Sequence, residues 1–146
     1  MSEPEETIAK AAKRPLKDAA YFLYQERIRL EPLLRPAFSD EELKRSRMRP
    51  IEEIKAQIRF ERDHAADGPV FGWLKCAHPG AADADIKAAI TAAAKFNDDC
   101  YENFPNDRGD FQKCIDDAVD RARRKNPQYS ELTYREARYW VMYYMK

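Results

Sequence analysis

Two residues near the middle of the chain have the spacing of a metal-binding pair. Glu61 and His64 are three residues apart, and on a helix such residues share a face, so that a carboxylate and an imidazole can hold one metal ion. Glu61 also continues the apolar spacing that begins at Ile51. The other histidine, His78, precedes a proline in a predicted loop and cannot complete a di-iron site. The simpler interpretation places His64 at the C-terminal end of a helix, where the dipole favours it.

A run of acidic residues offers a second pattern with chemical meaning. Asp116, Asp117 and Asp120 have the spacing of carboxylates that bind Mg²⁺. On a helix, however, they lie opposite an apolar face that contains Ile115 and Val119. Arginines three or four residues further along can pair with them. We therefore expect a solvated helix face at this position.

The three cysteines are an odd number without CxxC spacing, which is typical of reduced thiols. Cys100 comes one turn before the end of one predicted helix, and Cys114 comes about one turn into the next. If these helices form an antiparallel hairpin, a disulfide is an alternative to two small buried side chains. Cys76 is two residues from His78, and this separation in a loop does not indicate an activated nucleophile.

Basic residues gather at two places, 44–49 and 121–125. Each place ends a predicted helix with an acidic start, and this order complements the helix dipole without any partner. The chain carries 26 basic and 26 acidic residues, whereas proteins that bind phosphate backbones usually have a net positive charge. Nucleic-acid contact through these basic helix ends is therefore an alternative rather than the leading hypothesis.

The elements that position these residues are predicted to be helical. Of 146 residues, 36 % are charged and only 4 are glycine, a composition that favours solvated helices over a turn-rich sheet protein. We predict an all-α fold, a compact bundle of five to six helices, with 1–14 as a flexible N-terminal segment and 15–146 as a single helical domain. Helices are expected at 15–30, 39–49, 51–67, 83–104, 110–125 and 130–146. The helices at 83–104 and 110–125 should form an αα-hairpin, and 68–82 an irregular apolar loop.

The C-terminal helix is the most informative element. Its tail, 139–145, is apolar on every side, and a helix can hide only one stripe against its own domain. Aromatic and methionine side chains are enriched at the centres of protein interfaces. We predict an interface formed by Tyr139, Trp140, Val141, Tyr143, Tyr144 and Met145. The alternative is a central core helix.

The sequence contains no catalytic motif, no apolar run that could cross a bilayer and no signal peptide. We expect a cytoplasmic protein without a cofactor or membrane contact. The leading hypothesis is a non-catalytic interaction or accessory subunit that docks onto a protein partner, or onto itself, through its aromatic C-terminal helix. The alternatives are a small helical metal-binding or redox protein that uses Glu61, His64 and a cysteine, and a regulator that contacts nucleic acid.

Overall fold

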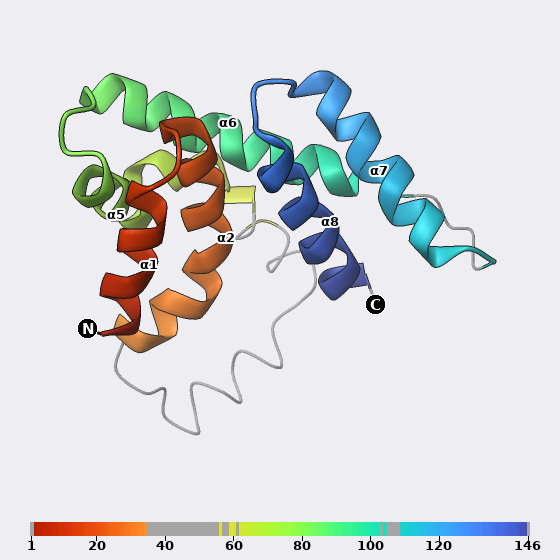
Figure 1. Cartoon of the computed structure of the whole chain (residues 1–146), viewed down its shortest axis with the longest axis horizontal. Helices are drawn as coiled ribbons and strands as arrows, with labels where there is room; N and C mark the ends of the chain where they lie inside the picture. The colour runs from red at the N-terminus through yellow and green to blue at the C-terminus, as the bar shows by residue number, and fades with distance from the viewer. Residues whose placement is uncertain are drawn as a thin grey trace.

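The computed structural model describes residues 2–34, 56, 59–60, 62–102, 104 and 109–145. All regular secondary structure in these ranges is helical, which confirms the all-α prediction and the helical bundle. Figure 1 shows α1 (Glu3–Ala12), α2 (Leu16–Leu34), the 3₁₀-helix η1 (Ala65–Asp67), α5 (Pro69–Ala77), α6 (Asp83–Tyr101), α7 (Phe111–Lys125) and α8 (Glu131–Met145).

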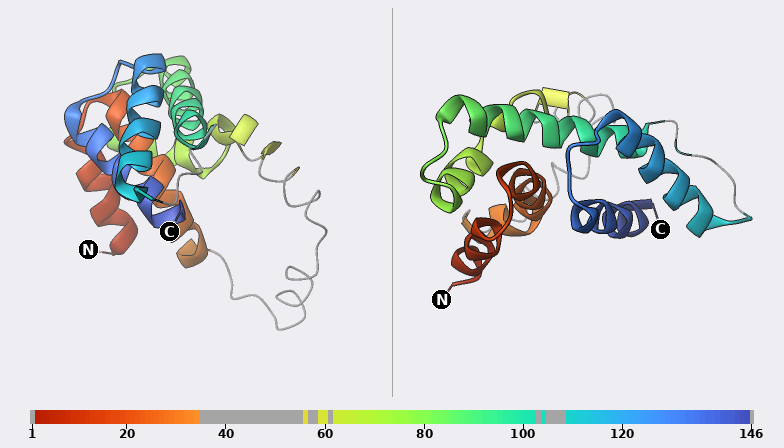
Figure 2. Two further views of the ribbon diagram at one scale, coloured as in Figure 1. Left: turned by 90° about the vertical axis from the view of Figure 1, so that its right-hand side faces the viewer. Right: turned by 45° about the horizontal axis from the view of Figure 1, so that its top comes forward.

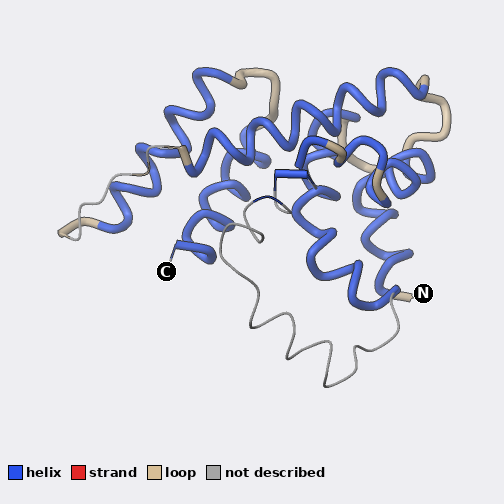
Figure 3. Tube along the Cα trace, turned by 180° about the vertical axis from the view of Figure 1, so that it is seen from behind, coloured by secondary structure: helices blue, strands red, loops and turns tan. Residues whose placement is uncertain are grey.

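Helix α6 is the central element of the bundle, because it packs against α2, η1, α5, α7 and α8. It runs across the molecule, with α1, α2 and α5 grouped around its first half and α7 and α8 around its second (Figure 1). The right-hand view of Figure 2 shows α2 and α8 on the same side of α6. Seen from behind in Figure 3, short loops connect α5 to α6 and α7 to α8.

An aromatic cluster joins these helices in the core. The ring of Phe96 on α6 lies 5.2 Å from that of Tyr21, 4.9 Å from Tyr129 and 5.6 Å from Tyr134 between centroids. All four rings are buried. Because each aromatic contact contributes about 0.5–1.5 kcal/mol beyond the burial of its area, the cluster fixes α2, α6 and the first turn of α8 to one another.

The predicted hairpin is present as α6 and α7, which pack against each other. Ile86 and Ile90 on α6 and Ile115 and Val119 on α7 are buried, each pair four residues apart. This spacing places each pair on one helix face. Helix α6 ends at Tyr101, slightly before the predicted boundary.

The N-terminal residues differ from the expected flexible segment 1–14, because most of them form α1. The Ser2 side chain accepts a hydrogen bond from the backbone N–H of Glu5 at 3.3 Å, which caps the helix. Thr7 and Ala11 are buried on one side, and Arg29 of α2 donates to the Thr7 hydroxyl at 3.2 Å. Tertiary contacts therefore hold a helix too short to be stable alone.

Residues 68–82 were expected to form an irregular loop, but Pro69–Ala77 form helix α5. Pro69 occupies the start of the helix, where its fixed φ is favourable. Val70, Leu74 and Ala77 are buried at helical spacing. The glycine content of this stretch obscured a short helix that is held by contacts with α1, α2 and α6.

Helix α2 also extends further than predicted. It continues past Pro32 to Leu34, although a proline lacks the N–H for one helical hydrogen bond. Leu30, one turn before the end, is buried and holds the preceding turn in the core. The helix predicted at 39–49 and most of the one at 51–67 lie outside the described residues.

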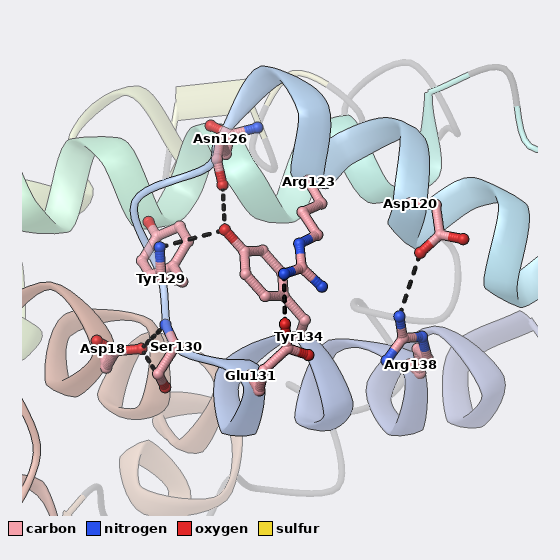
Figure 4. Close-up of polar contacts among 9 residues, drawn as sticks. All are labelled: Asp18, Asp120, Arg123, Asn126, Tyr129, Ser130, Glu131, Tyr134 and Arg138. Atoms are coloured by element: carbon pink, nitrogen blue, oxygen red, sulfur yellow. Dashed lines mark hydrogen bonds and ion pairs between the residues drawn. The ribbon is translucent and has the colours of Figure 1, made fainter.

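A buried carboxylate connects α2 to the start of α8. Asp18 is 4 % exposed, and its Oδ1 accepts hydrogen bonds from the Ser130 N–H at 2.9 Å and the Ser130 hydroxyl at 2.9 Å (Figure 4). The same oxygen also accepts a hydrogen bond from the Thr133 hydroxyl at 2.6 Å. Tyr134 completes the turn before α8, since its hydroxyl donates to the Asn126 carbonyl and accepts from the N–H of Tyr129. Side-chain contacts therefore set where α8 begins.

Truncations in the hairpin seam should destabilise the fold far more than loss of a surface charge. Ile90→Ala should lower the free energy of unfolding by about 2–4 kcal/mol and Val119→Ala by about 1–3 kcal/mol, since both side chains are fully buried. Asp117→Ala should cost less than about 0.5 kcal/mol, because Asp117 is exposed. Urea unfolding measures all three variants, and equal losses would show that the faces are wrongly assigned.

Loss of the Asp18 carboxylate should be as costly as a core truncation. Asp18→Ala leaves three donors without their acceptor, so we expect unfolding to become easier by about 2–4 kcal/mol. Asp18→Asn keeps one acceptor oxygen and should cost less. Hydrogen exchange should quicken first in the first turn of α8. An alanine variant as stable as the wild type would contradict this role.

Candidate functional site

Helix α8 has one face in the core and one face in solvent. Thr133, Tyr134, Ala137 and Val141 are buried and follow helical spacing along one stripe. Val141, predicted as an interface residue, therefore belongs to the core, where it is 1 % exposed. The stripe ends one turn before the helix does, and the last turn has fewer neighbours.

The other predicted interface residues form an exposed aromatic surface, which we call the aromatic patch: Tyr139, Trp140, Tyr143, Tyr144 and Met145. Their exposed fractions are 55 % for Tyr139, 60 % for Tyr143, 42 % for Tyr144 and 40 % for Met145, while Trp140 is half-buried. With 150–250 Å² per aromatic ring, the patch presents roughly 300–400 Å² to solvent.

Trp140 is the centre of the aromatic patch. Its ring lies 5.5 Å from Tyr139, 6.0 Å from Tyr143 and 5.9 Å from Tyr144, the last in a stacked arrangement. The rings of Tyr143 and Tyr144 also meet at 5.2 Å, edge to face. These mutual contacts restrict the rotamers of the exposed rings, and the patch is a pre-arranged surface.

The underside of the patch rests on the end of α6. The Tyr101 ring meets that of Tyr144 edge-on at 6.4 Å, and its hydroxyl donates to the Trp140 carbonyl at 3.5 Å. Burial raises the pKa of the Tyr101 hydroxyl well above its ordinary value, so it stays protonated as a donor. Partial burial also raises the pKa of Tyr144, and the charge of Arg27 on α2 opposes that rise.

Ion pairs hold α8 to its neighbours beside the patch. Arg138 lies 3.1 Å from Asp120 on α7 (Figure 4) and 3.8 Å from Asp116 on the same helix. On the other side, Arg14 contacts Glu136 at 2.6 Å. The acidic run of α7 is therefore partly solvated, as predicted, but an arginine of α8 pairs with two of its members. Sequence spacing within α7 cannot reveal that partner.

The predicted metal pair is only half within the described residues, because Glu61 lies outside them. His64 is exposed, its ring stacks on Phe60 at 4.1 Å between centroids, and its Nδ1 lies 3.0 Å from the Phe60 carbonyl. Among the described residues, no group of three or more metal-ligating side chains gathers. The Glu61–His64 site stays a prediction.

The cysteines of the hairpin are both in the interior. Cys100 on α6 and Cys114 on α7 are buried, whereas Cys76 on α5 is exposed. Burial, with a smaller contribution from Asp99, raises the pKa of the Cys100 thiol to about 12. A thiol of that pKa is a poor nucleophile for disulfide exchange. The pairing of Cys100 with Cys114 stays a prediction.

The basic end of α7 is partly neutralised within the fold. Arg123 pairs with Glu131 at the start of α8, and Lys125 lies 3.9 Å from Glu102 (Figure 4 shows the first pair). The other basic place, 44–49, lies outside the described residues. The nucleic-acid alternative therefore receives no support from the geometry of α7.

Two open grooves lie away from the patch. One of about 510 Å³ is lined by alanines of α6 together with Leu16, Lys17, Asp85 and Gln128. The other, of about 320 Å³, contains Arg62, which lies 3.2 Å from both Asp63 and Asp98. Neither groove brings together groups suited to acid–base or nucleophilic chemistry. No helix in the described part of the chain has the length and apolar content to cross a bilayer.

Cys100 and Cys76 should differ sharply in reactivity. In the folded chain at pH 8, iodoacetamide should modify the exposed Cys76 and leave Cys100 intact, because the Cys100 thiol is buried with a pKa of about 12. Peptide mass mapping identifies the modified residues. The urea-unfolded chain is the control, in which Cys100 should react as fast as Cys76. Equal rates in the folded chain would contradict the buried placement.

No family model, no curated protein and no solved structure matches the chain. Among the described residues, the aromatic patch has the largest set of exposed apolar side chains on one element.

Proposed function

We propose that this chain is a non-catalytic interaction or accessory subunit that docks onto a protein partner, or a second copy, through the aromatic patch of α8. The observation that carries the proposal is the exposure of Tyr139, Tyr143, Tyr144 and Met145 at the end of one helix, all between 40 % and 60 %. Grouped aromatic rings on a folded monomer mark an interaction site more often than scattered apolar residues do.

Burial of the patch would make a favourable contribution to the free energy of docking. Burying roughly 300–400 Å² at about 25 cal/mol per Å² corresponds to roughly 7–10 kcal/mol before the costs of association. Tyrosine also suits a surface that is sometimes free and sometimes bound, since its hydroxyl stays hydrated while the ring packs. A mixed apolar and hydroxyl-bearing surface is typical of a non-obligate interface.

The rigidity of the platform supports the same proposal. The start of α8 is fixed by Asp18, its middle by Val141 and Arg138, and its end by Tyr101. The ring contacts with Trp140 further restrict the exposed side chains. A pre-arranged surface loses little conformational entropy when it binds.

Loss of two tyrosines should abolish docking without unfolding the chain. The tagged protein would be purified from its own cells as the wild type and as the Tyr139→Ser/Tyr143→Ser double variant. We expect a stoichiometric partner, or a dimer, in the first preparation and its loss in the second, because the two most exposed rings of the patch are gone. Mass spectrometry and sedimentation velocity report the composition.

Leu132→Ser provides the matched control. Leu132 lies on the same helix and is 44 % exposed, but it is in the first turn, about two turns before Tyr139. This variant should keep the partner, and circular dichroism should show unchanged helicity in all three proteins. A monomer with no companion that depends on Tyr139 and Tyr143 would overturn the proposal.

A further inference from the structure

We propose that the aromatic patch binds an amphipathic helix of another protein, one whose apolar stripe is flanked by acidic side chains. This inference rests on the proposed function, because it names the chemistry of the partner at the same surface. It depends on three features of α8 and its surroundings: the charges at the edges of the patch, the area of the patch and the spacing of its rings.

Two arginines border the patch and form no ion pair of 4 Å or less within the described residues. Arg135 is exposed one turn before Tyr139. Arg27 donates to the Tyr24 carbonyl at 2.5 Å and its guanidinium lies 3.8 Å from the centre of the Tyr24 ring. Its charge reaches Tyr144, whose pKa it lowers against the effect of burial. Both edges therefore carry a positive charge.

The neighbouring carboxylates do not cancel that charge, because each one already has a cation. Glu131, one turn before Arg135, pairs with Arg123. Asp116 and Asp120 lie 3.8 Å and 3.1 Å from Arg138. Glu136 lies 2.6 Å from Arg14. The positive charges of Arg27 and Arg135 therefore remain to attract acidic groups on a ligand, and such complementarity selects partners and speeds encounter.

The area of the patch argues against a second copy as its occupant. Stable interfaces between two folded proteins, dimers included, bury about 800 Å² on each partner, whereas the patch offers roughly 300–400 Å², an area that one helix can cover. Two copies meeting patch to patch would also place Arg27 and Arg135 of each copy at one contact, four positive charges in all. Like charges at an interface oppose association.

A single helix fits the spacing of the exposed rings. Tyr139 and Tyr143 are four residues apart and form one ridge along α8, which packs into the groove between the side-chain rows of another helix. Helix recognition of this kind needs only three or four apolar anchors spaced at helical intervals. Acidic residues beside such anchors would reach the arginines at the edges of the ridge.

The test uses two synthetic helical peptides of 18 residues that share the same leucine stripe. The flanking positions carry glutamate in one peptide and lysine in the other. Fluorescence anisotropy of each labelled peptide, titrated with the full chain, gives its dissociation constant. We expect the glutamate peptide to bind at least about 10-fold more tightly in low salt, with a smaller difference at high ionic strength.

Charge reversal assigns the preference to the two arginines. Arg27→Glu/Arg135→Glu should abolish or invert the preference for the glutamate peptide. Lys17→Glu/Arg124→Glu is the matched control, because it changes the net charge equally at two exposed positions away from the patch. This control should keep the preference. Tyr139→Ser/Tyr143→Ser should weaken the binding of both peptides.

The remaining outcomes separate this inference from the proposed function. Equal binding of both peptides that depends on Tyr139 and Tyr143 would keep the docking surface and overturn the acidic partner. Binding of neither peptide would overturn the inference, while co-purification decides the proposed function. A dimer in sedimentation velocity that dissociates in the Tyr139→Ser/Tyr143→Ser variant would identify a second copy as the occupant and also overturn it.

Discussion

A single carboxylate oxygen sets the position of the last helix. Oδ1 of Asp18 accepts hydrogen bonds from Ser130 and Thr133, and these groups open α8 more than a hundred residues further along the chain. Asp18 is almost fully buried, where a carboxylate is tolerated only if its hydrogen bonds are made. The Asp18 carboxylate can therefore stay buried only while the first turn of α8 packs against α2. The direction of α8, and the place where its aromatic end emerges, follow from this contact.

The same residue type has opposite environments at the two ends of α8. Tyr134 is buried among the rings of Phe96 and Tyr129 and bonds to the Asn126 carbonyl. Tyr144 lies seven residues after the buried Ala137 and therefore points to nearly the same side of the helix, about two turns later, yet it is 42 % exposed. Helix α6 ends at Tyr101, whose ring is the one contact that α6 makes with Tyr144 among the described rings. The exposure of Tyr144 thus results from the relative lengths of α6 and α8, whereas Tyr139 and Tyr143 are exposed because they lie on the face of α8 opposite its buried stripe.

Periodicity in the sequence was sufficient to predict α6, α7 and the helical class, because Ile86, Ile90, Ile115 and Val119 repeat at helical intervals. It was insufficient for α1 and α5, which are short and depend on tertiary contacts that no local pattern contains. The sequence identified the tail of α8 as apolar, but it could not show which of these side chains are buried and which are exposed. Val141 proved to be a core residue. The role of Asp18 and the proximity of Arg27 to Tyr144 arise between residues far apart in the chain, so composition and spacing do not indicate them.

Arginine side chains around α8 have two distinct roles, and the difference bears on specificity. Arg138 and Arg14 form ion pairs with carboxylates of the same chain, and these ion pairs hold α8 in its orientation. Arg27 packs on the ring of Tyr24, which holds its guanidinium in place without neutralising it, and Arg135 projects from the exposed face. An aromatic surface alone binds any apolar surface. Discrimination among partners also requires groups that interact unfavourably with the wrong partner. The fixed positive charges at the edge of the aromatic patch supply such groups. A basic partner would make the same apolar contacts as an acidic one, but repulsion from Arg27 and Arg135 would weaken its binding.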